Sequence, residues 1–461
     1  MTYILGVNSF HADAAAALIK DGVIILAAEE ERFNRIKHSA GFPKNAIKWC
    51  IKESGISIND LSHIAINTNP NANLLKKLLY TFKNRPNPRF LFEKARVKFK
   101  RVSYEAQLKE LFNELNNTAK IHFVEHHLAH MASAFYASPF ESSAVLSVDG
   151  FGDFASTAWG FGNEKSLVID DQVIFPHSLG ILYTSITQYL GFPNYGDEYK
   201  VMGLAPYGED NFKKEISKLI NIKNDGKFEL NLNYFSHTKD WKAQQWDKGV
   251  PIIENQYSKK IIELLGMPRR NDEPIEQKHM DIARSTQELY EKVLFHILNN
   301  IYSKHNSDNL SLAGGCAANS VANGKITRKT PFKRVYIQAA AGDAGGAIGA
   351  ALEVWHKVGN KRSKSMGPAY FGPRANPSEL KNLINKKEIK RELNKENFEI
   401  IEYDLDKVSE NKLLDKVSNE IIKGKVIGWF QGRMEWGPRA LGNRSIIADP
   451  RNNNMKSILN S

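Results

Sequence analysis

The alternation of short apolar runs with polar or glycine-containing segments predicts a mixed α/β fold. In the N-terminal part, the pattern predicts strands at residues 3–7, 14–19, 23–26 and 64–66 and a helix at 44–54. Asp21-Gly22 has the composition of a hairpin turn between the second and third strands. The polar tip between the first two strands contains His11 and Asp13. Such a tip either contacts a phosphate or forms an ordinary turn, and both readings stay open for this segment.

A similar strand–polar tip–strand unit recurs at residues 143–161, with Asp149-Gly150 at the end of its first strand. Two more strands, predicted at 309–313 and 335–338, run into turns that contain Gly314, Gly315 and Gly342. Glycine after a buried strand lets backbone N–H groups approach a phosphate, although glycine turns are also a common structural device. The repeated unit is the layout of the actin, sugar-kinase and heat-shock-protein ATPase fold, in which two α/β lobes clamp a nucleotide.

Two histidines four residues apart, His126 and His130, lie in a segment of good helix formers. On a helix this spacing puts both imidazoles on one face, within reach of one ion. Asp149 follows the predicted strand 144–148, where a carboxylate is well placed to complete a metal site begun by a helix. Without further support, such a pair is more often a surface or core histidine cluster than a metal site.

The C-terminal part begins with residues 361–374, whose Lys, Ser, Gly and Pro content predicts a linker. The pattern then predicts a second domain over 375–461, with an amphipathic stretch of acidic and basic residues near 413–422 and a strand at 426–430. The loop after this strand contains Arg433, Arg439 and Arg444. Because guanidinium groups match the geometry of phosphate, this loop predicts an oxyanion clamp, with a charged turn as the alternative.

The composition, with 42% apolar and 25% charged residues in 461, is that of an ordinary globular protein of several domains. Cys50 and Cys316 cannot form a disulfide framework, which favours a reducing compartment. No apolar run approaches the roughly 18 residues that a membrane span needs. We therefore expect a cytoplasmic protein that has no membrane as a partner.

The net charge is +12, and part of the excess is local. Between Lys83 and Arg101, eight Lys or Arg residues stand against one acid, Glu93. Such a segment is usually a solvated surface, and it also suits the attraction of a polyanion or of phosphorylated substrates. Because the chain has no recognised nucleic-acid motif, we do not expect nucleic acid as a partner.

Taken together, several motifs resemble those of the NodU/CmcH/TobZ-type O-carbamoyltransferases of nodulation-factor and antibiotic tailoring. They agree in order and spacing and span nearly the whole chain, at residues 11–15, 29–33, 37–38, 41–43, 126–130, 149–150, 196–208, 314–319, 342–343 and 432–445. The resemblance implies an N-terminal domain similar to Kae1, the threonylcarbamoyl-transfer fold of the ATPase superfamily named above, followed by an α/β domain similar to YrdC.

The resemblance also implies the domain limits. We expect the Kae1-like domain at 1–360, with lobes of roughly 1–165 and 166–360, then the linker 361–374. Members of the family usually continue beyond the motif at 432–445 with a basic segment. The YrdC-like domain at 375–461 is therefore expected to be partial, which puts adenylate synthesis by this chain in question.

The implied chemistry has two steps. Carbamoyl phosphate and ATP give carbamoyl-adenylate and pyrophosphate in the YrdC-like domain, and the carbamoyl group then passes to a hydroxyl in the Kae1-like domain. The transfer would occur at a divalent metal held by His126, His130, Asp149 and Asp343, with Fe²⁺ as the expected ion and Mn²⁺ or Zn²⁺ as alternatives. Two imidazoles and two carboxylates suit any of these ions. His11, on the first polar tip, could take the proton from the attacking hydroxyl.

The resemblance assigns the remaining site residues by position. The residues expected to bind the nucleotide are Gly150, Gly314, Gly315, Asn319 and Gly342. Those expected to contact substrate or carbamoyl-adenylate are Lys37, His38, Asp197 and Lys200. Those expected to bind carbamoyl phosphate and ATP in the C-terminal domain are Arg433, Arg439 and Arg444. The expected acceptor is a small-molecule hydroxyl of a sugar or natural product, and the sequence leaves a homodimer open.

Two alternative functions remain at this stage. One is a Kae1-like threonylcarbamoyl transferase acting on tRNA, which the basic segment 83–101 would suit. The motif at 196–208 and the added C-terminal domain favour small-molecule carbamoylation instead. The other alternative is a truncated, non-catalytic paralogue that binds a nucleotide or a partner enzyme.

Overall fold

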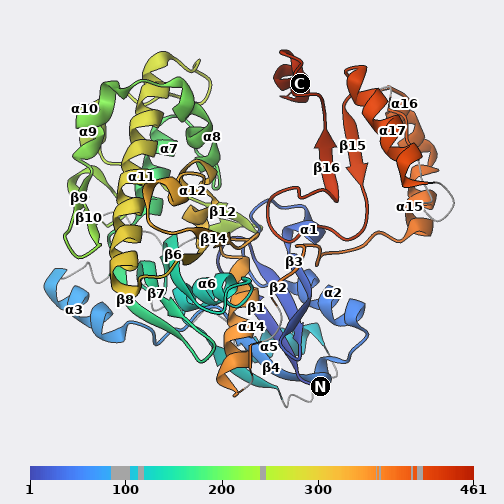
Figure 1. Ribbon diagram of the computed structural model, residues 1–461, viewed down its shortest axis with the longest axis horizontal. Helices are drawn as coiled ribbons and strands as arrows, with labels where there is room; N and C mark the ends of the chain where they lie inside the picture. The colour runs from blue at the N-terminus through green and yellow to red at the C-terminus, as the bar shows by residue number, and fades with distance from the viewer. Residues whose placement is uncertain are drawn as a thin grey trace. The chain divides into compact units, whose positions relative to one another are not determined.

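The computed structural model describes residues 1–84, 104–112, 119–238, 245–359, 361–362, 365–395, 398–401 and 409–460. The chain forms two compact units, Met1–Gly367 and Pro368–Ser461, and Figure 1 follows it from blue to red. The boundary between the units falls inside the segment 361–374 that we propose as a linker. Most of the basic segment 83–101 lies outside the described residues, from residue 85 onward.

The first sheet of unit 1 has the strand order β3-β2-β1-β4-β5. β1, β2 and β3 form antiparallel hairpins, and β4 and β5 continue the sheet parallel to β1. The strands are β1 (Tyr3–Asn8), β2 (Ala15–Lys20), β3 (Val23–Glu29), β4 (Leu61–Ile66) and β5 (Lys120–Phe123). Because helices pack on both faces, β1 and β2 are buried along nearly their whole length and appear in the sequence as continuous apolar runs.

The second sheet repeats this arrangement with the order β14-β13-β6-β7-β8. β6, β7 and β8 are antiparallel, and β13 and β14 lie parallel to β6. The strands are β6 (Ser143–Gly152), β7 (Ala155–Gly162), β8 (Leu167–Ile174), β13 (Asn309–Ala313) and β14 (Arg334–Ile337). The predicted mixed α/β fold with two related lobes is therefore confirmed.

Two helices pack between the sheets (Figure 1). α14 (Gly345–Lys357) lies on β1, and α6 (His126–Phe135) lies on α14 and on the second sheet. Small residues permit this close packing. A Cβ on Gly349 would lie 1.8 Å from the carbonyl oxygen of Ala129, and one on Gly6 would lie 1.9 Å from that of Ala347. The arrangement fixes α6, which carries the two spaced histidines, deep inside the unit.

The other face of the second sheet is covered by α7 (Leu179–Tyr189) and the long helix α11 (Gln277–His305), whose apolar sides form the larger core. α2 (Lys44–Ser54) covers the first sheet on the face opposite α14.

The other helices of unit 1 are α1 (Glu31–Asn34), α3 (Leu74–Asn84), α5 (Tyr104–Leu111), α8 (Glu198–Leu204), α9 (Lys213–Ser217), α10 (Lys259–Leu265), α12 (Ser320–Asn323) and α13 (Ile326–Lys329). Two small hairpins complete it, β9 (Ile220–Ile222) with β10 (Phe228–Leu230), and β11 (Gln245–Asp247) with β12 (Val250–Ile252).

Unit 2 is smaller and is built on one antiparallel pair, β15 (Ile427–Phe430) with β16 (Arg444–Ile447). Its helices are α15 (Pro377–Ile384), α16 (Lys387–Lys395), α17 (Glu410–Ile422) and α18 (Met455–Asn460). Trp436, which is fully buried, is the largest side chain of its interior. The amphipathic stretch 413–422 lies in α17, and the strand predicted at 426–430 is present as β15. The likeness to YrdC stays a prediction.

The expected division of the lobes near residue 165 does not match the sheets. β6 and β7 precede that position, yet both hydrogen-bond within the second sheet. The strand pattern could not show this, because β6 finds its parallel partner β13 more than 150 residues later. We therefore place the division between Phe123 and Ser143. Among the described residues, no helix is both long and apolar enough to cross a membrane.

Candidate metal centre and active site

Four side chains predicted as metal ligands come together at one point in unit 1. His126 and His130 stand one turn apart on α6, and Asp149 lies near the end of β6. Asp343 lies in the turn just before α14. One ligand atom from each of the four lies within 4.8 Å of all the others. The four side chains therefore come from α6, which lies between the lobes, and from the ends of strands in the second sheet.

The distances within this cluster fit a shared cation. The Nε2 atoms of His126 and His130 are 3.1 Å apart, and both face Oδ2 of Asp149, at 3.1 and 3.2 Å. Oδ1 of Asp343 lies 3.5 Å from each of these nitrogens. Two imidazole nitrogens and two carboxylate oxygens thus converge on one point, which is the arrangement of a four-ligand cation site. One divalent ion among them would satisfy all four atoms, and the N₂O₂ set suits Fe²⁺, Mn²⁺ or Zn²⁺.

The electrostatics of the cluster also call for a positive charge. Burial lowers the pKa of His126, but its hydrogen bond to Asp149 and the charges of Asp343 and Asp149 outweigh burial and raise that pKa to about 10. Burial likewise raises the pKa of Asp149, and its two histidine partners outweigh this and hold it well below the usual range. The two buried carboxylates therefore attract either protons or a cation to the histidine nitrogens.

His127, which lies between the two ligands, belongs to another environment. Its Nδ1 is 2.8 Å from Oγ of Ser147 on β6. Burial, together with the neighbouring histidines His126 and His130, lowers its pKa to about 3. It therefore stays neutral and outside the cluster.

Backbone groups orient the carboxylate of Asp149. Its Oδ1 accepts the N–H of Gly315 at 3.0 Å, which leaves Oδ2 directed at the histidines. The hydroxyl of Ser178, at the start of α7, donates to the carbonyl oxygens of Asp149 and Gly150 at 3.1 and 2.8 Å. The turn after β13 and the start of α7 thus fix the position and rotation of this ligand.

Two residues that the sequence did not single out hold the start of α6. Asp153 accepts the N–H of His126 at 2.9 Å and, from the first lobe, the N–H of Asn69 at 2.7 Å. Gly152 leaves room for the imidazole of His126, since a Cβ there would lie 2.0 Å from the ring. The polar tip 149–153 contained the signal, because Asp153 directly follows Gly152 and lies four residues after Asp149.

The cluster is open on a side lined by glycine. A Cβ on Gly150 would meet nothing within 4 Å, and one on Gly342 would meet only the Cα of Gly315, at 3.9 Å. A Cβ on Gly315 would meet only the carboxylate of Asp149. Three of the residues predicted to bind nucleotide therefore border free space beside the metal ligands, where a phosphate could approach the backbone.

The other two predicted nucleotide residues are used inside the fold. Gly314 has φ of +93°, and its added Cβ would lie 2.2 Å from the carbonyl oxygen of Val148, so glycine is required there by the packing of β13 against β6. Asn319 caps α12 by accepting the N–H of Ala322 at 3.0 Å. It also exchanges two amide hydrogen bonds with Gln287, at 2.9 and 3.0 Å. Both residues shape the turn, and their geometry does not favour direct contact with a nucleotide.

His11 lies on the tip between β1 and β2, and its ring centroid is 5.4 Å from that of His126. The side chain of Asn8 closes this tip by donating to the carbonyl oxygens of Ala12 and Asp13 at 3.1 and 2.8 Å. The structure thus places the predicted base next to the predicted metal ligands although 115 positions separate His11 and His126 in the sequence.

Tyr195 was missed by the sequence reasoning, although it lies just before the motif 196–208. Burial, then the charges of Asp343, Asp13 and Asp149, raise its pKa well above the usual range. Its ring is 5.1 Å from that of His38 in an edge-on contact. Tyr195 therefore lies between the metal ligands and the predicted substrate residues.

The predicted substrate residues form two hydrogen-bonded pairs next to Tyr195. Nδ1 of His38 is 2.8 Å from Oδ1 of Asp13, and Nζ of Lys200 is 2.8 Å from Oδ1 of Asp197. Burial lowers the pKa of His38, but the hydrogen bond and charge of Asp13 outweigh it and raise the pKa above its usual value. Lys37 lies beside this group, with its Nζ 5.9 Å from the centroid of the Tyr199 ring. The pairs present cations, which suits an anionic ligand.

Comparison with known proteins identifies the family. The family model described as "Carbamoyltransferase N-terminus" matches residues 3–352, and "Carbamoyltransferase C-terminus" matches residues 418–461. The chain belongs to the carbamoyltransferase family. The resemblance noted from the motifs is therefore confirmed, and the protein is a transferase by family.

Three relatives show how much of each known protein this carbamoyltransferase chain matches. "Uncharacterized protein sll1178" of Synechocystis sp. is 41% identical over the whole chain, which covers 73% of that protein. "Nodulation protein NolNO" of Sinorhizobium fredii is 34% identical over 98% of the chain and 61% of its own length. "3'-hydroxymethylcephem-O-carbamoyltransferase" of Streptomyces clavuligerus is 26% identical over 152 residues, 33% of the chain and 25% of that protein. The chain thus spans about three quarters of the length of the first relative and about three fifths of the length of the second.

In the C-terminal unit of the carbamoyltransferase, the arginine loop is held by its own backbone. The guanidinium of Arg444 lies 3.6 Å from the ring centroid of Phe430 and donates to the carbonyl oxygens of Asn443 and Gly432, at 2.8 and 3.2 Å. Arg433 donates to the carbonyl oxygen of Gly372 at 3.2 Å. These contacts give Arg444 and Arg433 a structural role, whereas Arg439 is exposed. Local carbonyl oxygens thus accept from two of the three guanidinium groups, and binding of carbamoyl phosphate or ATP by this loop stays a prediction.

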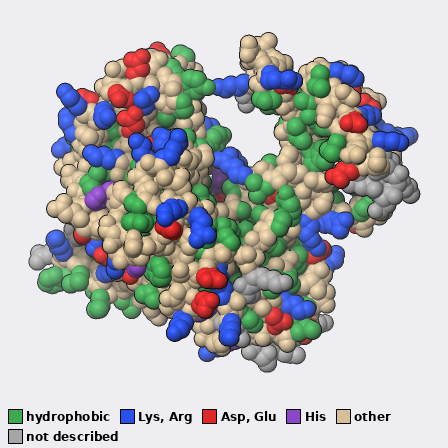
Figure 2. Space-filling model, viewed as in Figure 1, with side chains coloured by type: hydrophobic (Ala, Val, Ile, Leu, Met, Phe, Trp, Pro, Cys, Tyr) green, Lys and Arg blue, Asp and Glu red, His purple; other side chains and the backbone are tan. Residues whose placement is uncertain are grey.

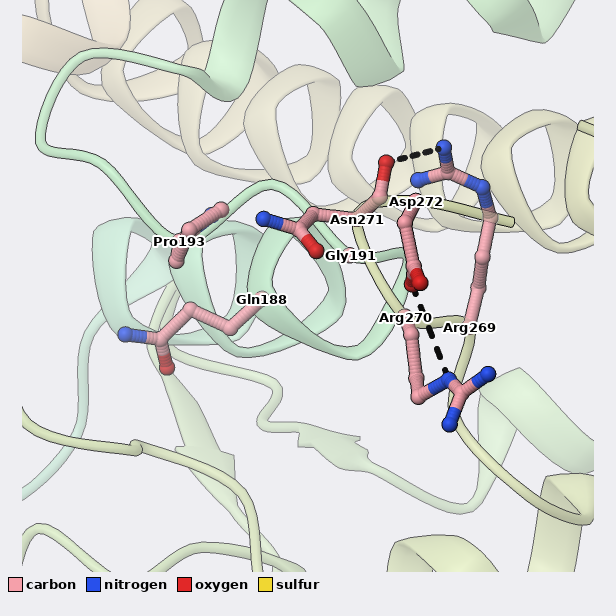
Figure 3. A pocket seen from close by; sticks show the side chains of 7 residues that line it. All are labelled: Gln188, Gly191, Pro193, Arg269, Arg270, Asn271 and Asp272. Atoms are coloured by element: carbon pink, nitrogen blue, oxygen red, sulfur yellow. Dashed lines mark hydrogen bonds and ion pairs between the residues drawn. The ribbon is translucent and has the colours of Figure 1, made fainter. Parts of the chain in front are cut away.

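The shallow pocket in Figure 3 is separate from the metal centre. It has a volume of about 480 Å³ and lies beyond the last turn of α7, whose first turn adjoins Gly150. Arg269 in its wall donates to the carbonyl oxygens of Leu190, Asn271 and Glu273, at 2.8, 3.2 and 3.0 Å. The pocket wall therefore anchors the loop that leads to Tyr195, and none of the predicted site residues lines it.

Proposed function

We propose that the chain is an O-carbamoyltransferase that passes a carbamoyl group, activated as carbamoyl-adenylate from ATP and carbamoyl phosphate, to a hydroxyl of a sugar or secondary metabolite. The observation that carries the proposal is the open cluster of His126, His130, Asp149 and Asp343 with His11 beside it. Membership of the carbamoyltransferase family supports carbamoyl as the group that is transferred. The cephem carbamoyltransferase among the relatives is named for a hydroxymethyl acceptor.

In this proposal the four clustered side chains hold one divalent metal, with iron as the first candidate. When bound, such an ion would polarise the carbamoyl carbonyl and neutralise the phosphate of the adenylate. The chain's own groups prepare the site for it. Gly315 keeps Asp149 turned to the histidines, and Asp153 with Glu125 fixes the first turn of α6 by accepting the N–H groups of His126 and Leu128.

His11 is proposed as the base that accepts the proton of the attacking hydroxyl at an imidazole nitrogen. It lies on a hairpin tip, and its ring centroid is 5.4 Å from that of His126. The proton lost by the hydroxyl would pass to His11 while the oxygen forms its bond to the carbamoyl carbon and AMP leaves. A base of this kind contributes about 10²–10⁴-fold to the rate.

The anionic adenylate needs cations and accessible N–H groups, and the site offers both. Gly150 and Gly342 leave the backbone uncovered, whereas the N–H of Gly315 is donated to Asp149. The His38–Asp13 and Lys200–Asp197 pairs, with Lys37, would hold the phosphate and orient the acceptor. We assign formation of the adenylate to the C-terminal unit together with any further segments of the whole protein, and Arg439 is the arginine of its loop that is available to an anion.

The test uses synthetic carbamoyl-adenylate, so that it depends only on the transfer step. The full chain is supplied with the metal and with a panel of amino sugars and hydroxymethyl compounds, and products are identified by mass spectrometry. We expect one carbamoyl group on a hydroxyl, and release of AMP that depends on the acceptor. His130→Ala should lose metal and transfer together, whereas His11→Asn should keep the metal and lose transfer. AMP release equal in the wild type and His130→Ala, with no carbamoylated compound, would contradict the proposal.

A further inference from the structure

Helix α3 (Leu74–Asn84) turns its apolar side to solvent. Leu75, Leu78, Leu79 and Phe82 are 76%, 65%, 68% and 83% exposed, and Leu74 at the first position is 48% exposed. The spacing places all five on one helix face. Figure 2 shows hydrophobic side chains gathered over this helix at the lower left, at the place that α3 has in Figure 1. A contiguous group of this kind marks a binding surface, unlike single exposed leucines.

The opposite side of α3 is fixed to the protein, so the outward direction of the leucines is built into the fold. The ring of Tyr80 packs at 5.7 Å from Phe154 and at 5.2 Å from Phe175. Nζ of Lys76 donates to Oε1 of Gln172 on β8 at 2.9 Å. A water-soluble helix normally buries its apolar face, and here the anchored face is the polar and aromatic one.

We propose that α3 is a peripheral membrane-binding helix that lays its leucine face into a surface of anionic lipid. An interfacial helix of this type has an apolar face of Leu and Phe with Lys or Arg beside it. The exposed Lys83 supplies a flanking charge, and its stem allows it to reach the headgroups from beside the apolar face. The sequence continues with seven Lys or Arg residues against Glu93 alone between 85 and 101, and the chain carries a net charge of +12.

Size argues against a second copy of this chain as the occupant. A stable protein interface engages about 20–30 residues on each side, whereas the apolar face of α3 consists of five side chains on 11 residues. A single helix face of this size is sufficient for the interface of a bilayer, where positive flanking residues add to the apolar contribution. Attachment of this kind needs no membrane span, and it would revise the expectation that a membrane is not a partner.

The experiment measures binding of the full chain to large unilamellar vesicles by co-sedimentation. Vesicles of phosphatidylcholine alone are compared with vesicles that also contain phosphatidylglycerol. We expect binding to the anionic vesicles that weakens as salt is raised. The double change Leu75→Ser/Leu79→Ser should lower the vesicle partition coefficient by about tenfold or more. Met267→Ser removes an equally exposed apolar side chain elsewhere in unit 1 and should leave binding unchanged.

Three outcomes would overturn the proposal. Binding by the double variant equal to that of the wild type would show that α3 is not the contact. A loss of thermal stability in the double variant, with no vesicle binding by the wild type, would show that protein covers the face. Light scattering that finds a dimer in the wild type and a monomer in the double variant would assign the face to a second copy. Metal content and carbamoyl transfer are expected to stay at wild-type levels, so a failure here is separable from a failure of the proposed function.

Discussion

Replacing Gly152 by alanine should weaken binding of the proposed metal without changing any of its four proposed ligands. The added Cβ would lie 2.0 Å from Cδ2 of His126 and 2.5 Å from its Nε2. To reach the 3.4 Å at which ordinary contact begins, the ring and the strand must separate by roughly 1.4 Å. The imidazole is fully buried, and its Nε2 lies 3.1 Å from Asp149. A shift of this size takes that pair beyond hydrogen-bonding distance and the nitrogen out of the coordination position.

The expected magnitude follows from losing one ligand of four. Changes that merely disturb the support of a ligand cost about 10–100-fold in metal affinity, and displacement of the ligand itself should cost at least as much. Overpacking of a buried strand should also lower the free energy of unfolding by about 1–3 kcal/mol. Metal titration by calorimetry, elemental analysis of the purified protein and a thermal melt measure these effects.

Gly150→Ala is the matched control, because it makes the same chemical change two residues away on the same strand. Its Cβ would meet nothing within 4 Å, so metal content and stability should equal those of the wild type. The free space there is the proposed approach of the adenylate, so affinity for carbamoyl-adenylate should fall. Wild-type metal affinity in Gly152→Ala would refute the placement of His126 in the coordination sphere.

Three further predictions concern pH and stability. Asp13→Asn should lower the pKa of His38, which NMR titration measures. Since the pKa of His38 is raised in the folded protein, the wild type should have a higher melting temperature than this variant. This difference should be largest below about pH 6.5 and should shrink as pH rises through the pKa of His38 in the folded protein. Burial raises the pKa of Glu435, but the backbone N–H groups of Leu441, Arg444 and Asn443 outweigh burial and lower that pKa below its ordinary value of 4.5. Glu435→Gln should therefore destabilise unit 2 by about 1–3 kcal/mol at neutral pH. Calorimetry should show this difference shrink as pH falls below 4.5 and vanish as pH falls through the lower pKa of the folded state. Asn319→Ala should cost about 0.5–2 kcal/mol of stability through the lost cap, while changing affinity for carbamoyl-adenylate less than about twofold.

Local patterns in the sequence predicted local structure well. The helix over 44–54 and the strand over 309–313 have the expected bounds, because an amphipathic helix and a buried strand ending in glycine are each determined by nearby residues. The convergence of His126 and His130 with Asp149 and Asp343 was anticipated through the family motifs. No spacing rule relates Asp343 to His130, since their proximity depends on the packing of α14 against α6.

Features that depend on tertiary contacts were missed. Gly152 has no pattern that distinguishes it from other glycines, and its role appears only when α6 packs beside β6. The stacking of Arg444 on Phe430 and its bonds to local carbonyl oxygens could not be deduced from composition, and its predicted contact with a phosphate stays a prediction. The outward face of α3 was missed for the opposite reason. An amphipathic pattern predicts which residues share a face, and it does not say which face the protein covers.

The duplicated sheet explains why the proposed base and the metal ligands meet. In each lobe the first hairpin ends in a polar tip. The first tip carries His11 and Asp13 between β1 and β2, and the second carries Asp149 near the end of β6 and Asp153 between β6 and β7. Equivalent tips of two related lobes face a common space, so one can supply the proton acceptor while the other supplies a metal ligand. Asp153 connects the lobes by accepting from Thr68 and Asn69 after β4 and from the first turn of α6. A shift of one lobe against the other would therefore disturb α6 and the distance from His11 to His126 together, which makes the arrangement of the lobes part of the proposed catalytic geometry.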